Sequence, residues 1–435
     1  MQQVAKLAKV TAKGYNLFNF IRSMASSSFK ERIPQATQDN IKETASAIFS
    51  SERTFNEFSD ILINRIGKVT IEYMMFTNPL AVLKKGRLEY GDTIEAIYIE
   101  LPEAHDFETE AVYSGEVFAR EIPKTLTAFY RRNYRVFYKT SMSEDQWRAA
   151  FTSWGELDRF VAALFQTLYT AAQYDEFLAM LNIINEAGEN GDIKSVAVSP
   201  VTDKESAENL LVSIKAHANK FVFPSAEYNT AGVLSNTPDK SNLVLFVDAD
   251  ADAFIDVKAL AAAFNIEYTK LNYRKIVIPA FGDADHTNMQ KVVAVLADER
   301  FLQVYDCLER FKNIENPSGL NTNWYAHYWR IMFACPWANV VAFTTVKPTI
   351  TSVTVSPSSG QQNKDTSIQL TAEVQGTGVF SKRVTWGVSG NTDNTTKVSN
   401  AGVLYIGKNE SGTLTVKAVS VEDSTKFGTA EYTVS

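Results

Sequence analysis

The spacing of apolar residues predicts one unusually long helix in the middle of the chain. From Ser153 to Ala187 there is no proline and no glycine after Gly155, and apolar residues return every three or four positions. At ~1.5 Å per residue this helix would be roughly 50 Å long, which exceeds the usual range of about 8–20 residues. Because no strict seven-residue repeat persists, we expect a single spine helix rather than a coiled coil.

Before the spine, Leu83–Lys139 predicts an extended hairpin. Its expected strands are Ile94–Ile99, Val112–Ile122 and Tyr130–Tyr138. They have charged ends and too few apolar residues to form a core of their own. We therefore expect the hairpin to lie on something else.

Shorter elements flank this hairpin. The pattern predicts a helix over Thr54–Ile66, ended by Gly67, and a strand over Val69–Phe76. Ser143 and Gln146 have the spacing of a capping box, which predicts a short helix leading into the spine.

Helices and strands alternate from Ser195 to Val346, which predicts a compact α/β domain with a mixed sheet. The expected helices are Ser206–Ala218 and Asp256–Phe264. The expected strands are Asn242–Asp248, Lys275–Pro279, Lys291–Asp298, Tyr325–Phe333 and Val340–Thr345.

After Lys347 and Pro348 helical periodicity disappears, and short alternating segments predict a β-sandwich over residues 349–435. Trp386 alternates with Val384 and Val388, so we expect it to fill the core of this tail. The expected strands are Ser352–Val355, Ser367–Val374, Arg383–Val388, Lys397–Ser399, Val403–Ile406, Gly412–Val421 and Thr429–Val434.

Charge is distributed unevenly along the 435 residues, whose formal net charge is −7. No acidic residue precedes Glu31, while the same stretch contains Lys6, Lys9, Lys13, Arg22 and Lys30. This basic segment is either a solvated terminus or a contact for nucleic acid or an acidic partner. No run of about 20 apolar residues exists, so we expect no membrane span. The only cysteines, Cys307 and Cys335, suit a reducing compartment.

Two acidic loops contain possible metal ligands, but neither has a complete ligand set. Asp248, Asp250 and Asp252 lack the glycine and glutamate of a calcium-binding loop, and Gly282–His286 fits a polar turn better than a ligand set. The four histidines are dispersed, and no nucleophile motif or phosphate-binding glycine loop occurs. We expect no catalytic, metal or cofactor site.

The order of elements, together with several short motifs, resembles the major capsid proteins of phi-29-like small tailed phages. The motifs lie at Asp60–Gly67, Asn78–Leu80, Lys84–Gly86, Phe118–Pro123, Ala150–Gly155, Asp248–Asp250, Ala261–Asn265 and Asn339–Phe343. The tail is similar to group 2 bacterial Ig-like domains at Val353–Pro357, Gln369–Ala372, Val384–Trp386, Val398–Gly402 and Leu414–Ala418.

The resemblance implies an α+β Hong-Kong-97-like capsid fold over residues 1–347, followed by an all-β Ig-like domain over 349–435. Within the capsid fold it implies an N-arm (1–66), an E-loop (83–139), a spine helix (153–187) and a mainly axial domain (195–345).

It also implies a structural protein without enzymatic activity. Hexamers and pentamers would form an icosahedral or prolate head with a scaffolding protein, a portal at one vertex, and packaged double-stranded DNA bound without sequence specificity. The basic residues would face scaffold or DNA. Assembly would take place in the bacterial cytoplasm, and the product would be a virion. The alternatives are a surface adhesin or receptor-binding protein that uses the Ig-like domain, and a metal-dependent enzyme that uses the acidic loops.

Overall fold

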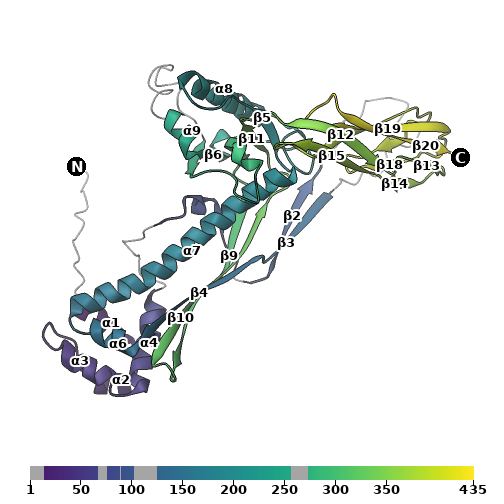
Figure 1. Ribbon diagram of the computed structural model, residues 1–435. Coiled ribbons are helices and arrows are strands. Elements are labelled where there is room, and N and C mark those ends of the chain that lie inside the picture. The colour runs from purple at the N-terminus through teal and green to yellow at the C-terminus, as the bar shows by residue number, and fades with distance from the viewer. Residues whose placement is uncertain (1–13, 67–75, 89, 102–124, 256–272) are drawn as a thin grey trace, which may run out of the picture.

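A single helix of 37 residues, α7 (Trp154–Asn190), connects the two ends of an elongated molecule (Figure 1). The computed structural model describes residues 14–66, 76–88, 90–101, 125–255 and 273–435. The expected strand Val112–Ile122 and the expected helix Asp256–Phe264 lie outside these ranges, as does the expected strand Val69–Phe76 apart from its last residue. The described chain is a mixed α+β structure.

The spine helix predicted from the sequence is confirmed. The Ser153 side chain accepts a hydrogen bond from the Glu156 backbone N–H at its start, and Gly191 ends it in the left-handed region at φ +82°. The helix continues through Gly188, where a Cβ atom would collide with Met289. Close packing of Met289 against the helix thus explains why a glycine occurs inside it.

Four helices surround the first turns of the spine: α1 (Gly14–Met24), α2 (Ser27–Arg32), α3 (Ile41–Ile48) and α4 (Glu52–Ile66). With α6 (Glu144–Ala150) they enclose an aromatic core. Trp147 lies at its centre, in edge contact with Phe55 and Phe58. The helix expected at Thr54–Ile66 is confirmed, with a start two residues earlier, and so is the capping box of Ser143 and Gln146.

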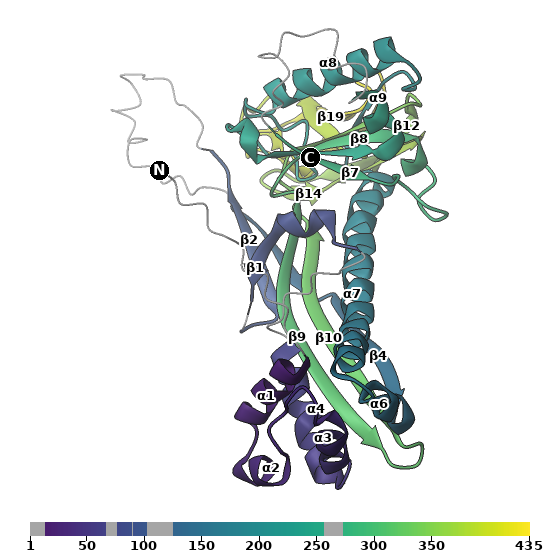
Figure 2. The same ribbon diagram turned by 90° about the vertical axis from the view of Figure 1, so that its left-hand side faces the viewer.

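A four-stranded sheet runs alongside the spine (Figure 2). Its order is β1 (Lys84–Arg87), β9 (Leu302–Asn316), β10 (Asn321–Ala334) and β4 (Tyr134–Ser143). The 3-10 turn η1 (Pro79–Leu83) precedes β1. The sequence did not predict β9, and the assignment of Tyr325–Phe333 to the α/β domain was wrong, because β10 pairs with β9 and β4 instead.

Strands β2 (Thr93–Ile99) and β3 (Thr125–Arg131) pair with each other to form the hairpin. The single strand expected over Tyr130–Tyr138 was wrong. The chain breaks at Arg132 and Asn133 because β3 belongs to the hairpin, whereas β4 belongs to the long sheet.

At the far end of the spine lies a mixed sheet with helices on its faces, as predicted, and it contains five strands. Alternate residues of β6 face α8 on one side and the last turns of α7 on the other, which explains the unbroken apolar run in β6. The strand order is β5 (Lys194–Ala197), β11 (Val340–Thr344), β8 (Val292–Asp298), β6 (Leu243–Asp248) and β7 (Arg274–Ile278); the helices are α8 (Lys204–Lys220) and α9 (Ala249–Phe254), with 3-10 turns η3 (Lys240–Asn242) and η5 (Met289–Lys291).

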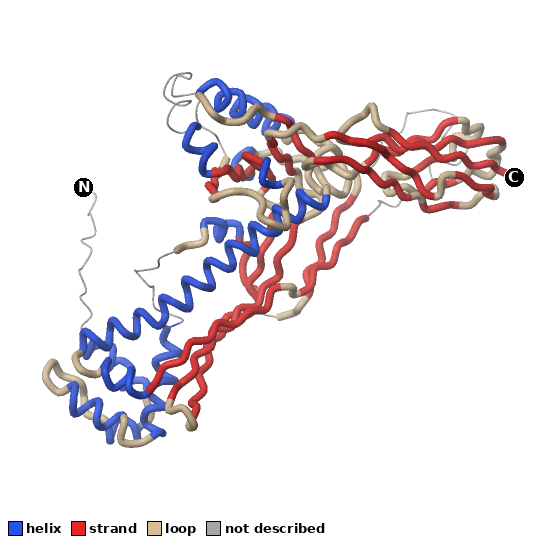
Figure 3. Tube along the Cα trace, viewed as in Figure 1, coloured by secondary structure: helices blue, strands red, loops and turns tan. Residues whose placement is uncertain are grey.

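The tail consists of short strands that share one apolar core (Figure 3). The strand expected over Ser367–Val374 was wrong as a single element, because it divides at Leu370, and β13 was not predicted. The strands are β12 (Thr349–Ser356), β13 (Ser359–Gln362), β14 (Ser367–Gln369), β15 (Thr371–Thr377), β16 (Val384–Ser389), β17 (Lys397–Val398), β18 (Val403–Tyr405), β19 (Gly412–Ser420) and β20 (Phe427–Val434).

A proline at Leu168 tests the structural role of the spine. Leu168 is buried in the middle of α7, and proline there removes a backbone hydrogen bond and clashes with the preceding turn. We expect Leu168→Pro to lower the free energy of unfolding by ~3 kcal/mol or more. Denaturant unfolding measures the effect, with Leu168→Met as the control. An unchanged unfolding midpoint in the proline variant would contradict a structural role of the spine.

Candidate assembly surfaces

One face of the hairpin of β2 and β3 exposes three large apolar side chains. Glu95 is paired with Phe129 and Ile97 with Thr127, so Ile97, Ile99 and Phe129 lie on the same side. These three side chains are 56%, 60% and 64% exposed. We call them the hairpin face. Single exposed apolar residues are ordinary, but a group on one protruding element is typical of an interaction site.

The opposite side of the hairpin is attached to the body of the molecule. Tyr130 stacks on Phe333 of β10 with ring centroids 3.6 Å apart, and burial raises the pKa of Tyr130 to about 12. The Tyr98 hydroxyl donates to the Leu234 carbonyl at 2.7 Å. The attachment of this side leaves the hairpin face directed away from the body.

Asn133 fixes the junction between the hairpin and the long sheet. Its side-chain amide donates to the Met332 carbonyl at 2.7 Å and accepts from the Met332 N–H at 3.0 Å. Next to it, the Arg132 guanidinium donates to the Gly91 carbonyl at 3.1 Å. These bonds hold both ends of the hairpin base.

A buried ion pair joins the spine to the long sheet. Glu176 of α7 is fully buried and Arg330 of β10 nearly so. Arg330 Nη2 lies 2.6 Å from Glu176 Oε2. The Arg330 guanidinium also lies over the ring of Tyr328, 5.1 Å from its centroid.

Lys84 and Asp306 extend this pair into a cluster of four charges. Lys84 Nζ lies 3.3 Å from Glu176 Oε1 and 2.7 Å from Asp306 Oδ2. Arg330 Nε donates to Asp306 Oδ1 at 2.8 Å. Two positive and two negative groups thus balance each other where α7, β1, β9 and β10 meet.

The basic residues predicted near the N-terminus do not form one patch in the described structure. Lys6, Lys9 and Lys13 lie outside the described residues. The Arg22 guanidinium donates to the carbonyls of Ile33 and Lys30 at 2.8 and 2.7 Å, where it holds the loop between α2 and α3 close to α1. The side chain of Lys30 is exposed.

The tail contacts the α/β region through polar groups. Arg383 donates to the carbonyls of Ala226 and Asn229, the second at 2.7 Å. The Glu422 carboxylate accepts from the backbone N–H groups of Ser381 and Ser195 at 3.0 and 3.4 Å. Trp386 packs against the tail core and is partly buried, whereas Tyr432 is fully buried there.

The acidic loops form local structural contacts. The Asp248 side chain accepts from the Asp250 N–H at the start of α9, Asp252 pairs with Lys275 at 2.9 Å, and Asp283 lies 2.7 Å from His286. Among the described residues, no group of three or more His, Cys, Asp or Glu side chains is arranged to hold a metal ion.

Both cysteines are buried. Burial raises the pKa of Cys335. A raised pKa keeps this thiol protonated and therefore unreactive.

Sequence reasoning missed the four-charge cluster, although a signal was present. Glu176 belongs to the series Leu168, Ala172, Glu176, Met180 and Ile184, whose members are four residues apart and all buried. A charge in such a stripe requires a buried partner. The same holds in β10, where every second residue is buried: Trp324, Ala326, Tyr328 and then Arg330. Arg330 is therefore a second charge at a buried position.

The model of the family described as "Phi29-like phage major capsid protein" matches residues 18–344. The chain belongs to this family. The match covers the helices at the spine's start, the described part of the hairpin and the α/β region, and it ends just before the tail. The protein is thus a major capsid protein of a tailed phage and a component of the virion, and its family is a structural class rather than an enzyme class.

Relatives of known name agree with this membership. The chain is 35% identical to the major capsid protein of Bacillus phage B103 over 411 residues, which cover 93% of this chain and 90% of the relative. It is 33% identical to that of Bacillus phage PZA, with coverage of 97% and 94%. A capsid structure of Staphylococcus phage Andhra matches 64% of this chain and 87% of its own, at 12% identity and a TM-score of 0.49.

In the parts of this capsid protein that the structure describes, no helix combines the length and apolar character needed to cross a membrane.

Removing one member of the buried ion pair tests its role. Arg330→Met leaves Glu176 buried opposite Lys84 alone, and we expect it to lower the free energy of unfolding by about 3–5 kcal/mol. Arg330→Met combined with Glu176→Leu leaves the Lys84–Asp306 pair satisfied and should recover most of that loss. Denaturant unfolding measures both variants.

Arg159→Met is the matched control, because it breaks the exposed pair with Glu156 and should cost less than about 1 kcal/mol. Additive losses in the double variant would contradict the coupling between Arg330 and Glu176.

Proposed function

We propose that this capsid protein adopts a Hong-Kong-97-like fold and associates as hexamers and pentamers of an icosahedral or prolate shell, with the hairpin of one subunit resting on its neighbour. The observation that carries this proposal is the hairpin face. β2 and β3 contain no fully buried side chain in their described residues, yet their base is firmly attached. An element that has no core of its own gains one by packing on another subunit.

The energetic argument favours association through this face. Burying a large apolar side chain stabilises a contact by about 1.5–3 kcal/mol, and the hairpin face offers three such side chains. One contact of this kind is weak in a dimer, but each subunit of a closed shell makes several at once. Repetition therefore converts a modest interface into a stable particle.

Charge substitutions on the hairpin face test this proposal. We expect Phe129→Glu and Ile97→Glu each to reduce the yield of shells about tenfold or more, since a charge would be buried in the interface. The unfolding midpoint of the subunit should not change, because both side chains are exposed in it. Electron microscopy and sedimentation of cell extracts that also contain the scaffolding protein provide the measurement.

Val212→Glu is the matched control, because Val212 is an exposed apolar residue of α8 far along the chain from the hairpin. Normal shells from the Phe129 and Ile97 variants would overturn the role of the hairpin face, and loss of shells from all three variants would show a general effect of added charge.

The scaffolding protein, the DNA and the portal are inferred as partners from the closed shell and from the positive charge of the N-terminal segment. We propose that Lys6, Lys9, Lys13, Arg22 and Lys30 face the scaffolding protein or the packaged double-stranded DNA, and that a portal occupies one vertex. Lysine and arginine contacts to phosphates carry no sequence information. Assembly would take place in the bacterial cytoplasm, before the DNA is enclosed.

We propose that the tail is a group 2 bacterial Ig-like domain in which Trp386 closes the core. Its short strands and shared apolar core support this assignment. The adhesin alternative is not favoured, because the family match covers the body of the chain rather than the tail.

Deletion of residues 349–435 tests the independence of the body. We expect the truncated chain to keep its secondary structure but to lose on the order of 3 kcal/mol of stability. The loss arises because Val379 of the tail is buried in the main core and Arg383 binds two body carbonyls. Circular dichroism and thermal unfolding measure these effects.

Arg383→Ala in the full chain is the control. It removes the polar contact and keeps Val379, so it separates the two contributions to stability. Global unfolding of the truncated chain would show that body and tail form one folding unit.

A further inference from the structure

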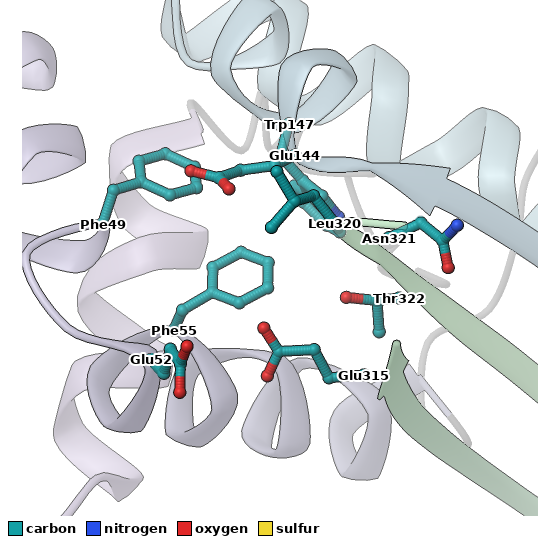
Figure 4. A pocket seen from close by; sticks show the side chains of 9 residues that line it. All are labelled: Phe49, Glu52, Phe55, Glu144, Trp147, Glu315, Leu320, Asn321 and Thr322. Atoms are coloured by element: carbon teal, nitrogen blue, oxygen red, sulfur yellow. The ribbon is translucent and has the colours of Figure 1, made fainter. Parts of the chain in front are cut away.

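A small pocket lies where the turn between β9 and β10 meets α4 and α6 (Figure 4). Its volume is about 70 Å³, which is roughly the space of two water molecules. Three aromatic rings and three carboxylates line it: Phe49, Phe55 and Trp147, and Glu52, Glu144 and Glu315. This composition suits a cation, which carboxylates attract and aromatic faces stabilise.

Two of the three carboxylates have no positive partner in the described structure. Glu144 pairs with Arg148, whose Nε donates to it at 2.9 Å. No described cation lies within ion-pair distance of Glu52 or Glu315. Figure 4 shows the Glu315 carboxylate directed towards the middle of the pocket, next to Phe55. Arg148 therefore compensates one of the three carboxylates, with its guanidinium over the ring of Phe49 at 4.9 Å from the centroid, and the charges of Glu52 and Glu315 remain uncompensated by any described cation.

An unpaired buried donor independently indicates that something binds. Trp147 is fully buried, and its indole Nε1–H has no hydrogen-bond partner. Trp147 and Leu320 both line the pocket (Figure 4). A buried donor left unpaired costs about 1–3 kcal/mol and is rare in native proteins. A peptide carbonyl would satisfy it.

The rim of the pocket is held in a strained conformation. Leu320 has φ +45°, a region that side chains with a Cβ seldom adopt, and it is largely exposed. The Glu144 N–H donates to its carbonyl at 2.9 Å. The turn is thereby held against the start of α6, so the pocket is present before any ligand arrives.

We propose that this pocket binds the basic N-terminal segment Met1–Lys13 of the same chain, with a lysine ammonium between the glutamates and a backbone carbonyl on Trp147. The segment contains Lys6, Lys9 and Lys13 and no acidic residue, so its charge is complementary to the pocket.

The tether favours the same chain over a second copy. Residue 14 begins α1, and α1 packs into the aromatic core that also contains Phe55 and Trp147. Thirteen residues reach at most roughly 45 Å, and a short tether raises the local concentration to the millimolar range. The pocket thus stores the basic segment until scaffold or DNA phosphate competes for its lysines.

A peptide titration tests the proposal. The full chain and a variant lacking residues 1–13 are each titrated with a fluorescent peptide of the sequence Met1–Lys13, and binding is followed by anisotropy. We expect saturable binding to the truncated variant and at least about tenfold weaker apparent binding to the full chain, where the tethered segment occupies the pocket.

Two changes assign that binding to the pocket. In the truncated variant, Glu52→Gln with Glu315→Gln should weaken binding about tenfold or more, while Glu431→Gln on the exposed face of β20 should not. A peptide with its three lysines replaced by glutamine should not bind, and this test leaves the folded chain unaltered. Equal binding to the glutamine double variant would overturn the pocket assignment. Equal binding to the full and truncated chains would overturn the same-chain assignment in favour of a second copy.

Discussion

The ion pair between Glu176 and Arg330 is the constraint on which the arrangement of this capsid subunit depends. A charge removed from water requires a compensating charge nearby, because the desolvation penalty is otherwise several kcal/mol. Glu176 is fixed on the spine, Arg330 on β10 of the long sheet, and Lys84 on β1 at the edge of that sheet. Any slip of the helix along the sheet would leave one of these charges unpaired. The cluster therefore specifies a single register for three elements that are far apart in the sequence.

This register explains how a slender molecule holds its two ends in position. The aromatic core around Trp147 packs the first turns of α7, and the α/β sheet packs its last turns. Between them the long sheet supports the helix together with η1 and Phe76, and there the four-charge cluster lies. The hairpin leaves the body at the same level, with its base held by Asn133 and Tyr130. A fixed base directs the hairpin face in one direction, as repeated contacts in a closed shell require.

Elements with a local sequence pattern were predicted correctly. Elements that depend on pairing between distant strands were not. The spine, the capping box of Ser143 and the strand β6 were predictable because helical spacing, cap spacing and a continuous apolar run are each visible within a short window. Strand β9 was missed because its charged second half is supported by β10, not by its own pattern. The break at Asn133 was missed because it depends on the backbone of Met332, which lies 199 residues away. The sequence signals that Glu176 and Arg330 each need a buried partner, but it does not show that they meet each other, for the same reason.

The contact between tail and body determines what the tail can contribute to a shell. Val379 is buried in the main core, and Arg383 and Glu422 bond to the backbone of the α/β region on different segments. Polar contacts to backbone groups depend on direction, so two such anchors together with one buried apolar side chain fix orientation as well as position. A tail joined to the body only by a flexible linker could adopt many orientations. A tail fixed in this manner presents the same surface on every copy, and weak contacts made by identical surfaces add together across the particle.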